Sequence, residues 1–160
     1  MDLWQSIGST VASEFSDIAD ITQTTQIVLR LLVAAILGGL LGFEREMKGK
    51  NAGVRTHMLV SFGAALFVLI PQQAGATIED ISRVLQGLVA GIGFLGAGAI
   101  VLGSQLRAPS GLTTAAGIWL TAAIGVAAGM GRESLAVLST FIAVVGLFVV
   151  PWVAQFARPK

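Results

Sequence analysis

The sequence predicts an all-α integral membrane protein, a bundle of five transmembrane helices with an amphipathic helix before the first span. Hydrophobic residues make up 54% of the chain and charged residues only 12%. The mean hydropathy is +0.82. The charges also lie in clusters between apolar runs, each close to the length of about 20 residues that crosses a hydrocarbon core as a helix. Residues 1–24 are expected to form the amphipathic segment and residues 25–160 the transmembrane domain.

The N-terminal segment carries a stripe of apolar residues at helical spacing. Asp17 and Asp20 lie off this stripe, as in an amphipathic helix. Such a helix lies in the outer interface of the membrane or packs on the bundle, and both placements stay open. The stripe consists of Leu3, Trp4, Ile7, Val11, Phe15 and Ile18.

Five apolar segments follow, separated by charges, prolines and glycines. The second is the shortest in uninterrupted apolar sequence, because Pro71, Gln72 and Gln73 follow residues 58–70. The other four have the length of a full span. The expected spans are residues 25–43, 56–76, 84–102, 111–130 and 135–156.

The basic residues of the connecting segments predict the orientation. One set of segments holds seven Lys and Arg residues, whereas the opposite set holds only Arg83 and Arg132. By the positive-inside rule the seven are cytoplasmic, which places the N-terminus outside and the C-terminus inside. The seven are Arg45, Lys48, Lys50, Arg55, Arg107, Arg158 and Lys160.

The glycines of the third span match the G-x-G-x-x-G spacing of a dinucleotide site at Gly91, Gly93 and Gly96. No carboxylate occurs between Asp80 and Glu133 to hold a ribose, so the nucleotide interpretation fails. Small residues instead let helices approach closely in lipid. Small-residue ladders recur at Ala34, Gly38 and Gly42, at Gly87, Gly91 and Gly98, and at Gly125 and Gly129.

Gly93 and Gly96 lie on a different face of the third span from Gly87 and Gly91. We therefore expect this span to be the central helix of the bundle, approached from two sides. The glycine faces exceed what one small bundle needs, which predicts a homo-oligomer. The alternative is a broken third helix beside a transport pathway, since glycine weakens helices.

The polar stretch from Gly42 to Phe67 begins at the cytoplasmic end of the first span. Charge near lipid is costly unless it is paired, so we expect Glu44 to pair with Arg55. The stretch is either an ordinary positive-inside loop or an ion or regulatory site formed by Glu44, Arg45, Glu46 and Arg55. Two carboxylates among four basic residues fit Mg²⁺ poorly. His57, the only histidine, is interpreted as an interface residue drawn towards the headgroups, with a proton relay as the alternative.

Two further polar features have structural interpretations. Ser110 is expected to cap the fourth span, with Thr113 and Thr114 forming hydrogen bonds between helices. A helix start of this kind also attracts anions. Arg30 is expected to reach outward, or to pair with an outer carboxylate such as Asp20 or Glu79.

The composition argues against several function classes. The net charge of +1 does not suggest nucleic-acid binding, and the absence of cysteine removes thiol chemistry. The sequence contains no hydrolase constellation, multi-histidine metal site or phosphate loop. We therefore expect no enzyme and no cofactor, with Mg²⁺ as a weakly supported ligand and membrane lipids as partners.

Three stretches, GFEREMKGKNAGVRTHMLVSFGAALF, GIGFLGAGAI and GLTTAAGIW, resemble the signature blocks of the MgtC/SapB family of bacterial inner-membrane proteins. The resemblance covers residues 31–125 and implies a multi-pass protein of the inner membrane. The matching residues are Glu44, Arg45, Glu46, Gly53, Arg55 and Thr56, then Gly91, Gly93, Phe94, Gly96 and Gly98, then Gly111, Leu112, Thr113 and Thr114.

The family resemblance implies a role in adaptation to low Mg²⁺ or acid stress and in virulence-type survival. It also implies a membrane partner such as the F-type ATP synthase, with Mg²⁺ or other cation transport as the alternative. Ser110 stands where a basic residue is expected, and Arg107 lies three positions before it. We expect no ACT-like domain after the membrane part, and therefore no ligand sensing through such a domain.

Overall fold

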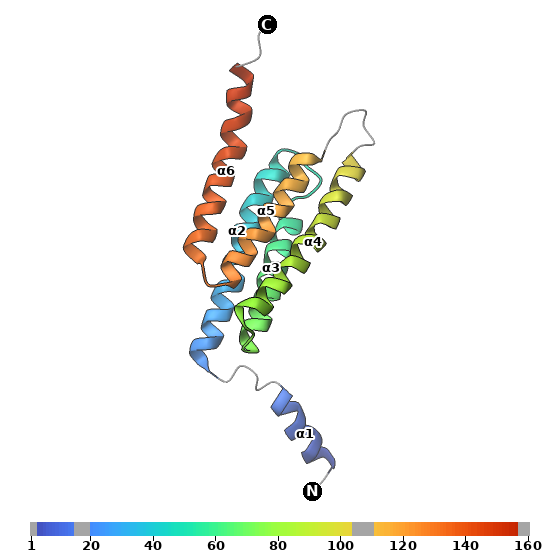
Figure 1. Cartoon of the computed structure of the whole chain (residues 1–160), viewed down its shortest axis with the longest axis vertical. Helices are drawn as coiled ribbons and strands as arrows, with labels where there is room; N and C mark the ends of the chain where they lie inside the picture. The colour runs from blue at the N-terminus through green and yellow to red at the C-terminus, as the bar shows by residue number, and fades with distance from the viewer. Residues whose placement is uncertain (1–2, 15–19, 104–110, 157–160) are drawn as a thin grey trace.

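A computed structural model describes residues 3–14, 20–103 and 111–156 (Figure 1). These residues form α-helices and no strand, and five of the helices are long and apolar enough to cross a membrane. The predicted all-α fold with five spans is confirmed. The helices are α1 (Leu3–Glu14), α2 (Ile21–Met47), α3 (Val54–Gln73), α4 (Ile78–Gly103), α5 (Leu112–Gly129) and α6 (Glu133–Phe156).

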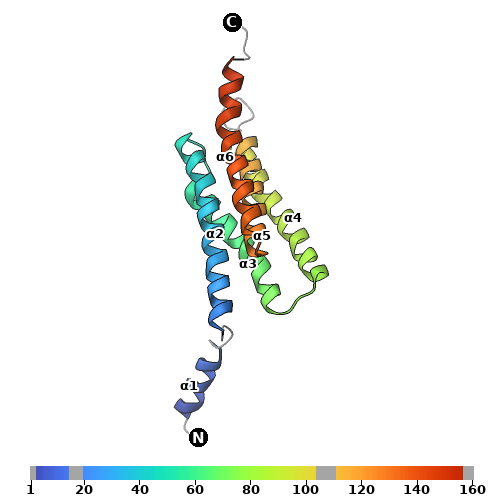
Figure 2. The ribbon, with the colours of Figure 1, turned by 90° about the vertical axis from the view of Figure 1, so that its left-hand side faces the viewer.

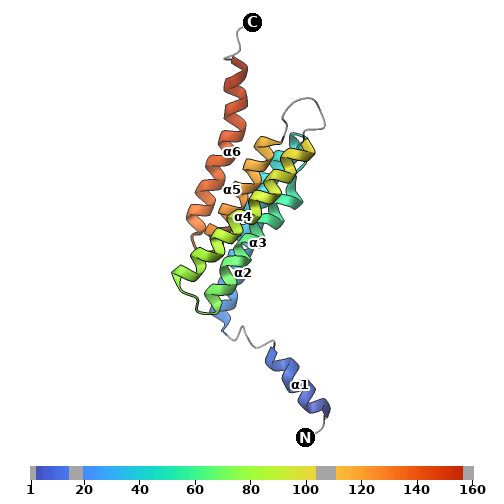
Figure 3. The same ribbon diagram turned by 45° about the vertical axis from the view of Figure 1, so that its right-hand side comes forward.

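Helix α1 lies apart from the bundle in all three ribbon views (Figures 1, 2 and 3). None of its residues is buried, including Leu3, Trp4, Ile7 and Val11 of the apolar stripe. Of the two placements expected from the sequence, packing on the bundle is therefore not the one observed. Phe15 and Ile18 lie outside the described residues.

Helix α3 is long enough to span because it continues through Pro71 to Gln73. Pro71 removes only its own backbone donor, and the turn after it still forms, because the backbone N–H of Ala74 donates to the Ile70 carbonyl oxygen at 3.1 Å. The short apolar run seen in the sequence therefore does not shorten the second span. Helix α3 therefore covers nearly all of the expected span of residues 56–76.

The central helix of the bundle is α5, which packs against α2, α3, α4 and α6 (Figures 1 and 3). Half of its spanning window is buried (50%), whereas only 6% of the window of α4 is buried. The expectation that the third span is central is therefore wrong. Helix α4 is peripheral and contacts only α3 and α5 among the described helices.

The glycine ladders of α2 and α5 explain this arrangement. A methyl group on Gly38 would lie 2.6 Å from the His57 carbonyl oxygen, and one on Gly129 would lie 2.7 Å from that of Ala65. Both helices therefore approach the backbone of α3 more closely than any side chain permits. Gly42 and Gly125 are in equally close contact with α3, so the packing interpretation holds for these four glycines.

The glycines of α4 have no such role within one chain. A methyl group would meet nothing within 4 Å at most of these positions, and at Gly96 it would make only an ordinary contact with Ala115. Helix α4 is also continuous, so the expected alternative of a broken helix is not observed. The open positions are Gly87, Gly91, Gly93 and Gly98.

Arg30 of α2 contacts residues at the ends of three other helices, α3, α5 and α6. Its Nη1 lies 3.3 Å from both the Gln72 side-chain oxygen and the Gly129 carbonyl oxygen. Its Nε lies 3.7 Å from Glu133 Oε1. The ionic partner is thus Glu133 of α6 and not Asp20 or Glu79, because the tight turn between α5 and α6 brings the start of α6 beside Arg30.

Candidate functional site

The candidate site lies where α2 ends and α3 begins. Gly49 has a φ of +62°, a left-handed conformation suited to glycine, and it stops α2. Glu46 then accepts a hydrogen bond from the backbone N–H of Val54 at 2.9 Å, which caps the start of α3. Gly53 at this start packs against Gly42 of α2. The short connection therefore holds the two helix ends side by side.

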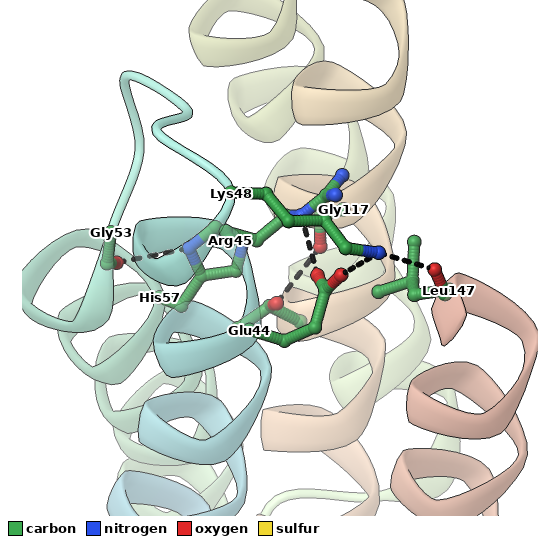
Figure 4. Close-up of polar contacts among 8 residues, drawn as sticks. Glu44, Arg45, Lys48, Gly53, His57, Gly117 and Leu147 are labelled. Carbon is green, nitrogen blue, oxygen red and sulfur yellow. Dashed lines mark hydrogen bonds and ion pairs between the residues drawn. The ribbon is translucent and has the colours of Figure 1, made fainter. Parts of the chain in front are cut away.

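Glu44 is the centre of this site and is only 2% exposed. Its Oε2 lies 2.7 Å from Arg45 Nε and its Oε1 lies 2.6 Å from Lys48 Nζ (Figure 4). The sequence analysis was right to expect a basic partner but wrong to expect Arg55, which is exposed. Lys48 follows Glu44 by four residues and so lies on the same face of α2.

Lys48 extends the network to α6. Its Nζ donates a hydrogen bond to the Leu147 carbonyl oxygen at 2.6 Å and lies 4.9 Å from the centre of the Phe148 ring. Pro151 of α6 has no N–H, so the Leu147 carbonyl lacks the donor that a regular helix supplies four residues later. The ammonium group of Lys48 satisfies this carbonyl, which is important for a helix in lipid.

His57 is completely buried (0% exposed) and faces α5. Its Nδ1 lies 3.1 Å from the Gly53 carbonyl oxygen (Figure 4). A methyl group on Gly117 would lie 3.4 Å from its Nε2, so the lack of a side chain at this position leaves room beside the ring. The expectation that His57 lies at the lipid interface is wrong, because it lies on the face of α3 that meets α2 and α5.

We call Glu44, Arg45, Lys48 and His57 the Glu44 cluster. The other residues predicted for the site do not all lie with it. Thr114 is buried in the bundle, whereas Thr56 and Thr113 are exposed. Gly111 occupies the N-cap of α5 with a φ of +102°, and Ser110, the predicted cap, lies outside the described residues. The α4 glycines lie on another helix, away from the cluster.

The expectations from the sequence omit two contributors to the site, namely Lys48 and Gly117. The spacing of four residues between Glu44 and Lys48 could have indicated the first. Gly117 could not be distinguished from the other glycines, because its importance depends on what faces it.

The donor set does not fit Mg²⁺, which prefers oxygen ligands and octahedral geometry. Both oxygens of Glu44 already face cationic side chains, and Glu46 caps α3. The described ranges contain no group of three or more His, Asp or Glu residues able to hold a metal. The arrangement instead combines one buried carboxylate with several basic groups, which favours contact with an anion or with another protein.

Comparison with known proteins places these features in context. The MgtC family model matches residues 31–156. Protein SrpB of Synechococcus elongatus is 44% identical over 133 residues, covering 74% of this chain and 71% of that protein. The putative magnesium transporter YhiD of Escherichia coli is 43% identical over 121 residues, covering 71% of this chain and 55% of that protein.

Protein MgtC of Salmonella typhimurium is 42% identical over 116 residues, covering 72% of this chain and 48% of that protein. The match therefore spans most of SrpB but only about half the length of YhiD and MgtC. No solved structure matches the chain.

Proposed function

Because the chain belongs to the MgtC family, we propose that it is a non-enzymatic regulator that supports adaptation to low Mg²⁺ or acid stress. It is a multi-pass membrane protein with five spans, and its membrane is proposed to be the bacterial inner membrane. It acts by contacting a membrane partner, such as the F-type ATP synthase, through the end of the bundle that holds Glu44.

The observation that carries this proposal is the state of Glu44. It is the only carboxylate that is buried in the described part of the chain, and Arg45 and Lys48 neutralise it. A cation pathway normally uses intramembrane carboxylates that are free to meet the ion. A carboxylate whose two oxygens are already paired with cationic side chains supports a rigid docking surface better than a transport site.

The name of YhiD keeps magnesium transport as the second candidate function. The two functions are separated by reconstituting the purified chain in liposomes that contain a trapped Mg²⁺ indicator. We expect Mg²⁺ entry no faster than in protein-free liposomes. Entry that increases with the amount of correctly folded protein would establish transport and overturn the regulatory proposal.

The proposed partner is tested with inverted membrane vesicles from cells that contain or lack the chain. ATP-driven acidification of the vesicle interior reports proton pumping by the ATP synthase. We expect slower acidification when the chain is present at equal ATP synthase content. Equal rates would remove the ATP synthase as the partner.

A further inference from the structure

A groove of about 670 Å³ lies beside the Glu44 cluster, bounded by α2, α5 and α6. Its walls along α5 and α6 are mainly apolar, with side chains such as Leu120, Leu147 and Val150. The glycines at positions 117 and 146 widen it. A groove of this kind on a membrane helix bundle accepts a hydrocarbon chain.

One end of the groove is basic. Arg45, Lys48 and Lys50 line it, and no carboxylate is among the described residues that do so. Glu44 lies behind this lining and compensates Arg45 and Lys48 with a single negative charge. The basic end therefore carries an excess of positive charge, next to an apolar wall.

Two buried polar atoms at this end have no partner among the described residues. Arg45 Nη1 and His57 Nε2 make no hydrogen bond, although the two side chains are only 4% and 0% exposed. Leaving such groups unpaired is costly. A guanidinium N–H can only donate, so the missing partner of Arg45 is an acceptor oxygen.

His57 needs a different kind of partner. The Gly53 carbonyl near its Nδ1 can only accept a hydrogen bond, which assigns the proton to Nδ1 in the neutral ring. Nε2 then accepts, and its missing partner is a donor such as a hydroxyl group. Arg45 and His57 both line the groove, so a molecule bound in the groove would supply both missing partners.

We propose that this groove binds one anionic phospholipid with a hydroxyl-bearing headgroup, such as phosphatidylglycerol. The phosphate oxygens meet Arg45 and Lys50, a headgroup hydroxyl donates to His57 Nε2, and an acyl chain lies along α5 and α6. Free phosphate offers the same oxygens but leaves the apolar wall uncovered. Lipid binding is a property of the chain whether it regulates or transports.

The test is native mass spectrometry of the full chain in detergent, with phosphatidylglycerol or phosphatidylcholine of identical acyl chains. We expect one phosphatidylglycerol to be retained under conditions that remove phosphatidylcholine. Millimolar inorganic phosphate should not displace it. Equal retention of the two lipids, or displacement by inorganic phosphate alone, would overturn the proposal.

Two variants locate the bound lipid. Lys50→Gln should weaken retention about fivefold, the effect of one basic residue at an anionic lipid surface. Its matched control is Arg55→Gln, which removes one exposed positive charge at the same end of the bundle but outside the groove lining, and which should leave retention unchanged. Equal losses in the two variants would indicate general surface attraction and contradict the proposal.

Gly117→Ala tests the polar pocket without disturbing the fold. The added methyl group would lie 3.4 Å from His57 Nε2 and 4.0 Å from Arg45 Cδ, which are ordinary contacts, and alanine favours a helix. The variant should fold normally and lose at least as much lipid retention as Lys50→Gln. If folded Gly117→Ala retained phosphatidylglycerol fully, the lipid would bind elsewhere and the proposal would be wrong.

Discussion

Lys48 of α2 donates a hydrogen bond to the Leu147 carbonyl of α6 at 2.6 Å, at the carbonyl that Pro151 leaves without a helical donor. The proline thus creates an acceptor in α6, and the lysine supplies the donor from another helix. The same ammonium group forms an ion pair with buried Glu44. One side chain therefore links the charged cluster to α6.

A double-mutant cycle tests this relationship. Lys48→Met should lower the free energy of unfolding by about 1.5–3 kcal/mol, because it removes hydrogen bonds from a charged donor. Pro151→Ala returns an N–H to α6, so the same lysine change should cost about 1 kcal/mol less in that background. Denaturation of the four proteins in detergent measures the difference. If Lys48→Met lowered the free energy of unfolding by the same amount in both backgrounds, Lys48 would not compensate for the donor that Pro151 lacks.

Glu44 and Arg45 should behave as one unit. Glu44→Gln leaves Arg45 as a buried charge with weaker compensation and should destabilise the protein by about 3–5 kcal/mol. The double change Glu44→Gln with Arg45→Met should cost less than the sum of the single changes. Thermal unfolding of purified variants measures these effects. The control is Arg55→Gln, whose exposed side chain lies outside the network and should shift stability by less than about 0.5 kcal/mol.

Replacing a glycine with alanine should have opposite effects on stability in α5 and in α4. A methyl group on Gly125 would lie 2.8 Å from Ser61 Cα, so Gly125→Ala should destabilise by about 1–3 kcal/mol through overpacking. Gly87→Ala adds the same atoms where nothing lies within 4 Å, and alanine is the better helix former by about 1 kcal/mol. The free energy of unfolding, measured in detergent, should therefore fall for Gly125→Ala and rise for Gly87→Ala. Equal destabilisation would contradict the packing described for α5.

The fold could be predicted because membrane spans depend on two properties visible in any sequence, apolar length and the position of charges. Which helix is central could not be predicted. Gly91 and Gly125 look alike in sequence, but only Gly125 faces a neighbouring backbone.

The location of the candidate site around Glu44 could also be predicted, whereas the contacts between its side chains and other helices could not. Buried charge requires a partner, and this principle correctly indicated that Glu44 is paired. The choice between Arg55 and Lys48 depends on the direction in which each helix presents its side chains. The link from Lys48 to Leu147 joins residues 99 positions apart. Periodicity within one helix carries no information about such a contact.

The orientation predicted from the positive-inside rule can be measured directly, because the chain contains no cysteine. Lys50, in the connection between α2 and α3, and Glu79, in the first turn of α4, are both exposed and lie at opposite ends of the bundle. A membrane-impermeant maleimide should label Glu79→Cys in intact cells and Lys50→Cys only after permeabilisation. Labelling of Lys50→Cys in intact cells would reverse the orientation.

The open glycine face of α4 predicts a homo-oligomer. A methyl group on Gly87, Gly91 or Gly98 would meet no atom of the described residues within 4 Å, and small residues on a lipid-facing helix permit close approach of a second helix. Gly91→Cys should therefore form a disulfide-linked dimer in membranes treated with a mild oxidant, detected by electrophoresis without reductant. The matched control is Ile142→Cys, on an exposed face of α6 without such a ladder, which should stay monomeric. Cross-linking in both variants would reflect random collision, and cross-linking in neither would exclude a dimer through α4.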